Sequence, residues 1–236
     1  MRLADLARLN AARAARRPIA LVTDITTNSQ RIVDAEALEQ DALGEAVAER
    51  MRLGKSGLLA DGVHFVTVQV PSVRLVVIGA VHISQALATM ARLTELDVTI
   101  IDPRTAFATP ERFPDVRLLA EWPDEAIERI GLDPYTAVCL LTHDPKIDDP
   151  ALVAALKTGC FYIGALGSRK THGRRLDRMR EHGFDDAALA RIHAPIGLDI
   201  GAVSPAEIAV AILGEIIAAL RRKPRRDERA AAEAAA

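Results

Sequence analysis

This chain of 236 residues contains few aromatic residues and few cysteines, and neither basic nor acidic residues are in large excess. Aromatics make up 3% of it, so the side chains of Ala, Val, Ile and Leu must fill the core. Two cysteines cannot build a framework of disulfides, and their scarcity indicates a reducing compartment. The 30 basic residues stand against 32 acidic ones, a formal net charge of −2, which disfavours a nucleic-acid binder with a basic surface throughout.

Long uncharged apolar runs are missing as well. The longest apolar segment, 206–220, contains Glu207 and Glu215 and falls short of the roughly 18 uncharged residues that a membrane span needs. The N-terminus has no continuous apolar region of the secretory kind. Its arginines weakly suggest a transit peptide, but an amphipathic helix ended by Pro18 is the favoured interpretation. The residues expected on the inner face of that helix are Leu3, Leu6 and Leu9. We therefore expect a soluble, cytoplasmic protein without a membrane span.

Half of the residues are hydrophobic, and their pattern changes near Arg74. Residues 1–72 predict a small α+β unit, residues 73–223 a second domain, and residues 224–236 a disordered tail without apolar periodicity. The elements expected in the first unit are strands at 19–25, 30–35 and 64–70 and a helix over 36–53.

The second domain alternates short apolar runs with helical patterns. The runs are typical of strands buried on both faces and lie at 74–80, 98–102, 116–120, 137–141 and 161–166. Helices are expected at 84–93, 124–130, 150–157, 170–182 and 205–220. This rhythm predicts an α/β fold, a Rossmann-like parallel sheet with right-handed crossovers and helices on both faces. Ligands of such sheets bind at the carboxyl ends of the strands, so the residues after each strand are the candidates for function.

Local signals mark several helix ends. Asp149 and Pro150 are typical of an N-cap followed by the first helical position. Gly159 is typical of the residue that follows a helix. Ser204 and Glu207 have the spacing of a capping box before the last helix. The cations expected to complement the dipole at the end of that helix are Arg221, Arg222 and Lys223.

The turn after the first strand of the second domain matches a phosphate-binding turn only in part. Gly79 occupies the first glycine position of G-x-G-x-x-G, but Val81 and Ser84 replace the other two. Because the side chain of Val81 would obstruct the pyrophosphate of a nicotinamide dinucleotide, NAD and NADP are disfavoured as cofactors. His82 precedes the helix expected at 84–93, and it either contacts a ligand at the helix start or is a capping or solvent-facing residue.

Polar residues follow the second and fourth strands. Asp102 lies where dinucleotide folds place their ribose-binding acid, and together with Arg104 it could hold a hydroxyl and a phosphate. The alternative for this pair is a surface ion pair at a turn. The candidate segment after the fourth strand is 142–149, which begins with Thr142, His143 and Asp144 and also contains Lys146, Asp148 and Asp149. We favour a polar ligand clamp there, with a helix-capping loop as the alternative and a divalent-metal site as the weakest one, because ligand spacing is lacking.

The segment after the fifth strand is the most informative. Gly164 and Gly167 permit a tight turn and close backbone approach, and Ser168 is a candidate N-cap. Arg169 and Lys170 then open a strongly basic helix, although cations in a first turn oppose the helix dipole. The basic run continues with Arg174, Arg175, Arg178 and Arg180, against only Asp177. A bound anion such as phosphate would resolve this conflict by accepting from the backbone amides and the guanidinium. A solvated basic helix face is the alternative.

A glycine-flanked loop before the last helix supplies the final candidates. Gly197 permits a close turn, and Asp199 lies among apolar residues, where it is either a ligand contact or a buried turn carboxylate that needs partners. Cys139 is expected in the core, and Cys160 has no neighbouring His or Cys. Because neither a Ser-His-Asp order nor a P-loop stands out, the sequence does not predict a covalent catalyst.

Taken together, these segments resemble the XdhC/CoxI family, accessory proteins of molybdenum hydroxylases such as xanthine and carbon monoxide dehydrogenases. The resemblance runs from about Arg74 to Leu220 and rests on VVIGAVHISQAL, IDPRTAFATPERFP, LTHDPKIDD, FYIGALGSRKTH and APIGLDIGAVSPAEIAVAIL. Each segment is modest alone, and their order and spacing carry the match. Two features depart from the family: Val81 stands where many members have Gly, and the region before Arg74 lacks the cysteine-bearing motif of longer members.

The resemblance implies a cofactor-binding maturation factor. Such proteins bind the molybdenum cofactor, a molybdopterin that is often in a dinucleotide form. They deliver it to a partner molybdenum hydroxylase apoenzyme, in some cases together with sulfuration of the metal centre, which calls for a sulfur-donating desulfurase. A nicotinamide-dependent oxidoreductase on the same sheet and a scaffold that binds no ligand are the alternative hypotheses. A homodimer is a further expectation, because the alanine-rich helix at 205–220 could pack closely against its twin.

Overall fold

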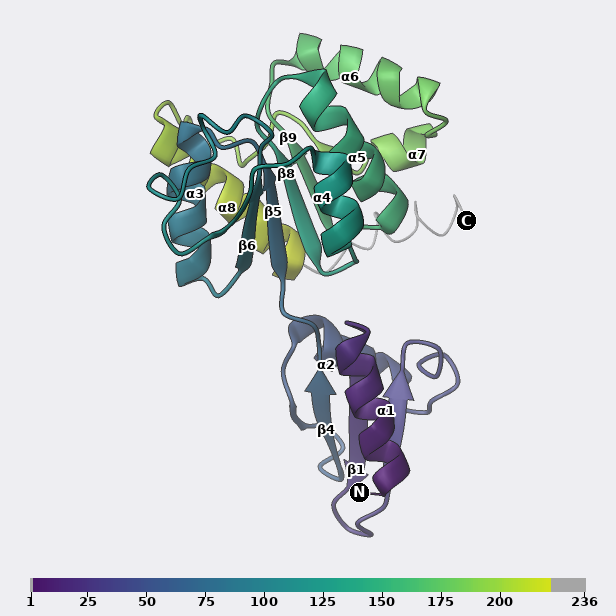
Figure 1. The fold of residues 1–236 in the computed structure, drawn as a ribbon. Coiled ribbons are helices and arrows are strands. Elements are labelled where there is room, and N and C mark those ends of the chain that lie inside the picture. The colour runs from purple at the N-terminus through teal and green to yellow at the C-terminus, as the bar shows by residue number, and fades with distance from the viewer. Residues whose placement is uncertain (1, 222–236) are drawn as a thin grey trace. The chain divides into compact units, whose positions relative to one another are not determined.

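The computed structural model describes residues 2–221, which fall into two compact units (Figure 1). The first unit covers Met1–Ser72 and the second begins at Val73. The predicted disordered tail at 224–236 lies outside the described residues. Among the residues that are described, none of the helices is both long enough and apolar enough to cross a membrane.

The first unit is built on a four-stranded antiparallel sheet in the order β2-β1-β4-β3. Its elements are α1 (Leu3–Ala14), β1 (Ile19–Asp24), β2 (Gln30–Asp34), α2 (Gly44–Leu53), β3 (Gly57–Leu58) and β4 (His64–Gln69). The prediction of a helix over 36–53 is wrong in its first half, where the chain forms turns. Side chains stabilise these turns, because the Asp41 carboxylate pairs with Arg31 and accepts from the backbone N–H of Leu43.

The buried face of α1 also differs from the prediction. Leu9 is buried as expected, but Leu3 and Leu6 are 86% and 39% exposed. The inward stripe consists of Asp5, Leu9 and Ala12, whose spacing places them on one side of a helix with 3.6 residues per turn. At 3.6 residues per turn Leu6 lies to one side of this stripe and Leu3 nearly opposite it, so both remain in contact with solvent.

The second unit contains a six-stranded parallel sheet in the order β10-β9-β8-β5-β6-β7. Its strands are β5 (Arg74–Ile78), β6 (Asp97–Ile101), β7 (Arg117–Leu119), β8 (Thr136–Leu140), β9 (Tyr162–Ala165) and β10 (Ile192–His193). The Rossmann-like prediction is confirmed, with β5 and β6 adjacent and parallel. The sixth strand, β10, was missed because two residues show no recognisable pattern.

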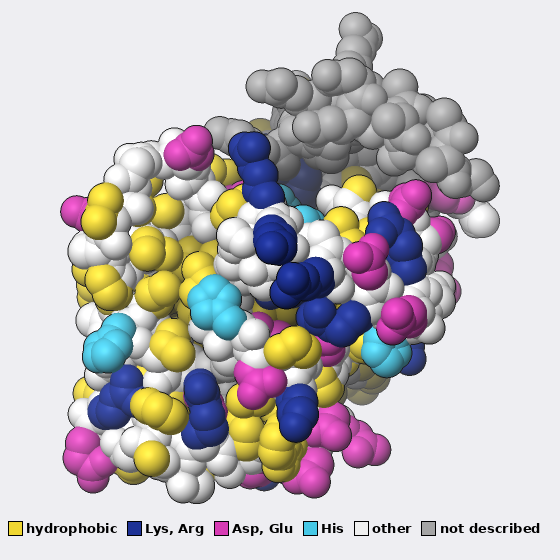
Figure 2. All heavy atoms as spheres, turned by 90° about the horizontal axis from the view of Figure 1, so that it is seen from above, with side chains coloured by type: hydrophobic (Ala, Val, Ile, Leu, Met, Phe, Trp, Pro, Cys, Tyr) yellow, Lys and Arg dark blue, Asp and Glu magenta, His cyan; other side chains and the backbone are white. Residues whose placement is uncertain are grey.

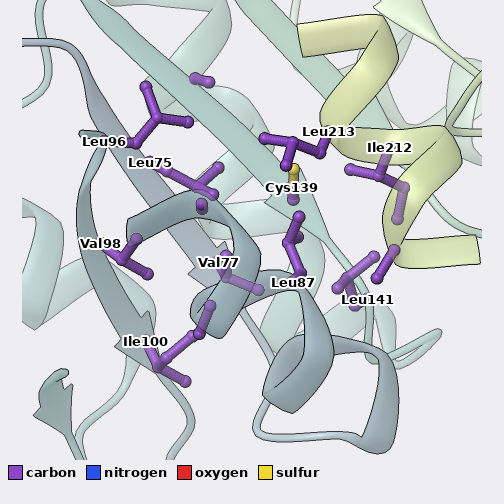
Figure 3. Close-up of a cluster of buried hydrophobic side chains, with 14 of the residues drawn as sticks. Leu75, Val77, Leu87, Leu96, Val98, Ile100, Cys139, Leu141, Ile212 and Leu213 are labelled. Carbon is purple, nitrogen blue, oxygen red and sulfur yellow. The ribbon is translucent and has the colours of Figure 1, made fainter. Parts of the chain in front are cut away.

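Helices cover both faces of this sheet, as predicted (Figure 1). One face packs against α3 (His82–Leu93) and α8 (Pro205–Arg221). Figure 3 shows that core, in which strand side chains such as Leu75 and Val77 meet Leu87 of α3 and Ile212 of α8. The other face packs against α4 (Pro123–Ile130), α5 (Pro145–Thr158), α6 (Arg169–Glu181) and α7 (Asp186–Leu189). Aliphatic and alanine side chains thus provide both cores, with few aromatics.

The start of α5 corrects a predicted helix boundary. The N-cap is Asp144, whose carboxylate accepts from the N–H of Lys146, so the helix begins at Pro145. Asp149, the predicted cap, instead lies inside the helix and is buried. The capping box before α8 is confirmed, since Ser204 and Glu207 exchange side chain to backbone hydrogen bonds. The predicted cations at 222 and 223 lie outside the described residues.

Candidate functional site

The strand order places a switch point between β5 and β8. From β5 the chain continues through α3 to β6 on one side, and from β8 it continues through α5 to β9 on the other. The loops that leave such a pair flank a crevice at the carboxyl edge of the sheet, which is the usual ligand position in open α/β sheets. Figure 2 looks onto this edge, where Lys and Arg side chains form a row beside His, Asp and Glu side chains.

The turn after β5 lies against the loop after β8. Gly79 has a φ of +114°, and a Cβ on it would lie 2.8 Å from Cγ2 of Thr142, so the residue must be glycine for both reasons. Ser84 is buried; its hydroxyl donates to the carbonyl oxygen of Gly79 and accepts from the N–H of Val81. Ser84 therefore fixes the turn that leads into α3. His82 is exposed in the first turn of this helix.

Asp102 joins the loops after β5 and β6. Its fully buried carboxylate accepts from the N–H of Ala80 at 2.7 Å and from Nε and Nη2 of Arg104 at 2.9 and 2.7 Å. Burial would raise the pKa of Asp102, but these hydrogen bonds outweigh it and hold the pKa below its usual value. The guanidinium of Arg104 also lies 4.8 Å from the ring centre of Phe107, which is 46% exposed. This edge of the crevice therefore offers a cation and a flat aromatic surface.

The loop after β8 is organised by a carboxylate of the predicted candidate segment 142–149. Asp148 is buried in α5 and accepts from the hydroxyl of Thr142 at 2.7 Å and from the N–H of His143 at 3.2 Å. This bonding helps to hold His143 at a φ of +65°, an unusual backbone conformation for a residue other than glycine. Burial raises the pKa of Asp148. Asp144 is exposed and caps α5, so its own role is local.

The loop after β9 meets the same loop. Gly167 has a φ of +136°, and a Cβ on it would lie 3.7 Å from Nδ1 of His143. The hydroxyl of Ser168 accepts from the N–H of Thr171 and thereby caps α6, as predicted. Arg169 and Lys170 are exposed at the start of that helix; the structure thus brings this basic segment close to His143.

Three predicted site residues lie elsewhere. Gly164 lies within β9, where a Cβ would lie 2.5 Å from Cδ1 of Ile196, so packing requires glycine there. Gly197 packs against α8 and donates its N–H to the carboxylate of Glu215 at 2.8 Å. Asp199 is exposed, so the alternative of a buried turn carboxylate is wrong for this residue. Glu215 is the carboxylate that binds this loop.

A cavity of about 180 Å³ lies between the loop after β8, the start of α5 and α6. Its walls are His143, Pro145, Asp148, Thr171, Arg174, Arg175 and Arg178. Arg178 forms a bidentate ion pair with Asp149 of α5. The basic run of α6 is therefore partly turned inward. The two predicted interpretations were an anion at the helix start and a solvated basic face, and neither included this arrangement.

The titratable residues give little sign of nucleophilic or metal chemistry. Cys139 and Cys160 are both buried, and burial raises the pKa of each thiol, which suppresses the reactive thiolate. Within residues 2–221, no group of three or more His, Cys, Asp or Glu side chains is placed to hold a metal ion. The polar groups of the crevice are suited to holding a ligand.

The parallel sheet and its switch point define a Rossmann-like α/β protein, a fold whose ligands usually bind at the carboxyl edge of the sheet. A family model for the XdhC Rossmann domain matches residues 75–216, and the chain belongs to this family. The matched region begins in β5 and ends in α8, so it includes all six strands of the second sheet.

Curated relatives share the same region. The chain is 34% identical over 162 residues to "Uncharacterized protein YqeB" of Escherichia coli, covering 68% of this chain and 30% of that protein. It is 33% identical over 146 residues to "Molybdenum cofactor insertion chaperone PaoD" of Escherichia coli, covering 62% and 40%. It is 30% identical over 153 residues to a protein of Bacillus subtilis that is named as a probable xanthine dehydrogenase component, covering 64% and 44%. The matches thus span less than half of each relative.

A solved structure has the same fold. The crystal structure of a xanthine dehydrogenase from Bacillus halodurans superposes with a TM-score of 0.65 at 22% identity. The match covers 93% of this chain and 65% of that one. At this identity the likeness concerns the fold alone.

Proposed function

We propose that this protein binds the molybdenum cofactor and assists its insertion into a partner molybdenum hydroxylase apoenzyme of the xanthine or carbon monoxide dehydrogenase type. The proposal is supported by membership of the XdhC family and by the similarity to a relative named as a molybdenum cofactor insertion chaperone. The test is transfer of the cofactor from this protein to such an apoenzyme.

The observation that carries the proposal is the convergence of donors at the switch point. The cofactor combines a flat heterocycle with a phosphate, so it calls for a stacking surface and for anion donors. Arg104 and Phe107 supply the first. The starts of α3 and α6 present backbone amides at the same edge, and Arg169 and Lys170 add cations at the start of α6. His143, in the loop after β8, lies beside Gly167 in the loop after β9. These residues would hold the cofactor, whose metal centre the apoenzyme then uses.

The partners follow from the same proposal. A hydroxylase apoenzyme receives the cofactor, and a sulfur-donating desulfurase acts where the metal centre is sulfurated. A homodimer could form through α8, whose outer face exposes Val210 by 50% and Ile217 by 38%. A dinucleotide form of the cofactor belongs to the same proposal, and the exposed Arg169 and Lys170 at the start of α6 would pair with its second phosphate.

We expect NAD and NADP to bind the wild-type protein no more tightly than about 1 mM. The half-buried Val81 side chain fills the position of the second glycine in a dinucleotide turn, and the oxygens of Asp102 already accept from Ala80 and Arg104. Val81→Gly should relieve the clash and gain nicotinamide affinity, at a cost of roughly 1 kcal/mol in backbone entropy. Calorimetric titration of both proteins measures this. Tight NAD binding by the wild type would favour the oxidoreductase instead.

A further inference from the structure

Buried donor nitrogens of Arg175, in the wall of the cavity beside α6, lack hydrogen-bond partners among the described residues. The Arg175 side chain is 2% exposed, and its Nη2 donates to the carbonyl oxygen of Leu166 at 3.0 Å. Its Nε and Nη1 are buried and have no partner within the part of the chain that the structure describes. Buried donors without acceptors cost free energy, and in native proteins such donors commonly mark a site for a water, an ion or a ligand.

The surrounding charges favour an anion over water. The Asp148 carboxylate lies 4.0 Å from Nη2 of Arg175, and its oxygens already accept from Thr142 and His143. Asp149, the carboxylate of the next residue, is engaged by Arg178. Because Arg178 and Asp149 compensate each other, the cavity walls retain the guanidinium groups of Arg174 and Arg175 against the one carboxylate of Asp148. Burial lowers the pKa of Arg175, as expected for a cation whose charge is incompletely balanced.

The cavity also has the right size and surroundings for a tetrahedral oxyanion. Its volume of about 180 Å³ is several times the roughly 30 Å³ that one water takes in the liquid. The hydroxyl-bearing Thr171 and the exposed Arg174 line it beside Arg175. Guanidinium N–H groups donate charge-assisted hydrogen bonds to phosphate oxygens. Nε and Nη1 of Arg175 lie on opposite sides of the guanidinium, so a phosphate in the cavity can accept from one of these two unpaired donors.

We infer that this cavity is a subsite for a phosphate group, whose oxygens accept from an unpaired donor nitrogen of Arg175 and from Arg174. The inference rests on the proposed function and deepens it, because the proposed function identifies the molecule that carries the phosphate. His143 lines the cavity and lies beside Gly167 at the crevice, so a cofactor whose heterocycle occupies the crevice could place its phosphate here. The proposed anion site thus uses Arg174 and Arg175 of α6, whereas the sequence suggested the helix start near Arg169.

The first test uses inorganic phosphate on the full chain, at ionic strength matched with sodium chloride so that screening is constant. Phosphate at 100 times its Kd should raise the unfolding midpoint by roughly 5 °C or more. Arg174→Gln should weaken phosphate about 10- to 100-fold, as expected when a charge-assisted hydrogen bond is lost. Because Arg174 is exposed, this variant should fold normally. Arg175→Gln should abolish the phosphate effect.

Arg180→Gln is the matched control. Arg180 lies on the same helix, is 50% exposed and pairs with Asp177 and Asp186 outside the cavity, so its loss should leave phosphate affinity unchanged. No phosphate-dependent shift in the wild type, or equal weakening by Arg174→Gln and Arg180→Gln, would overturn the subsite.

A competition experiment separates this inference from the proposed function. Inorganic phosphate should displace the molybdenum cofactor from the wild type, and Arg174→Gln should weaken both ligands. If the cofactor binds tightly but phosphate neither binds nor competes, the subsite is wrong and the proposed function stands. If phosphate binds as described but no cofactor binds, the subsite stands for free phosphate and the proposed function is wrong.

Discussion

Asp102→Asn should lower the free energy of unfolding by about 2–4 kcal/mol. The buried carboxylate accepts from Ala80 and from two nitrogens of Arg104, and an Asn amide would turn an N–H₂ group toward one of these donors. The expected loss is below that of a fully buried ion pair because the Arg104 side chain is 37% exposed. Since the same bonds join the loops after β5 and β6, cofactor binding should weaken as well.

Urea unfolding at neutral pH measures this, with Asp115→Asn as the control. This control makes the same chemical change at a side chain that is 76% exposed and lies 3.6 Å from Arg92. It should therefore lower the free energy of unfolding by less than about 0.5 kcal/mol. The folded protein holds the pKa of Asp102 below its usual value, so its contribution is complete above about pH 4 and is lost as the pH falls further. The stability gap between wild type and Asp102→Asn should therefore narrow in acid. Equal losses in the two variants would show that the bonds of Asp102 are not what stabilises this edge.

Glu215→Ala should also destabilise the second unit by about 2–4 kcal/mol. The Glu215 carboxylate accepts from the Tyr162 hydroxyl at 2.6 Å and from the Gly197 N–H at 2.8 Å, and it lies 3.0 Å from Nδ1 of His193. Burial would raise the pKa of Glu215, but hydrogen bonds from His193 and Tyr162 outweigh it. Its removal leaves the buried Tyr162 hydroxyl and the Gly197 N–H without their acceptor.

Glu207→Ala on the same helix is the comparison for Glu215→Ala. Glu207 only caps α8, accepting from the backbone N–H groups of Val203 and Ser204 at the exposed helix start, so its loss should cost about 0.5–1 kcal/mol. Tyr162→Phe in the Glu215→Ala background should cost little further, because the two residues share one hydrogen bond. If the Glu215→Ala and Glu207→Ala variants unfolded at the same urea concentration, that result would contradict this account.

The main features of the sheet could be predicted because its strands are buried on both faces. Runs such as 75–78 and 137–140 consist largely of buried apolar side chains, and such runs are visible without any knowledge of their partners. The two-residue strand β10 has no such run, and only its pairing with β9 defines it. Local pattern therefore predicted the long elements and missed the short ones.

Two identical local signals show the limit of capping rules. Asp144-Pro145 and Asp149-Pro150 are both typical helix starts, and the second was the predicted one. The structure uses the first, because Asp149 is needed inside the helix as the partner of Arg178 on α6. That pairing joins residues 29 apart in sequence, so no local rule could have found it.

The candidate site could be predicted to the level of loops but not of all its side chains. Strand ends pointed to Gly79, Asp102 and Gly167, which the structure does place along one edge. Asp148 and Arg175 lay in the candidate segments but could not be singled out from the sequence, because burial and the partners that other elements bring are what distinguish them. The one signal in the sequence was the density of arginines in α6, which exceeds what capping requires.

Cofactor transfer tests the central proposal most directly. The purified protein, loaded with molybdenum cofactor, is mixed with a cofactor-free molybdenum hydroxylase apoenzyme, and the pterin and molybdenum in each are measured after separation. The account predicts that this protein loses cofactor as the apoenzyme gains it and becomes active, and that transfer falls with Asp102→Asn. Failure of the protein to hold the cofactor, or apoenzyme activation that is equal with and without it, would contradict the proposed function.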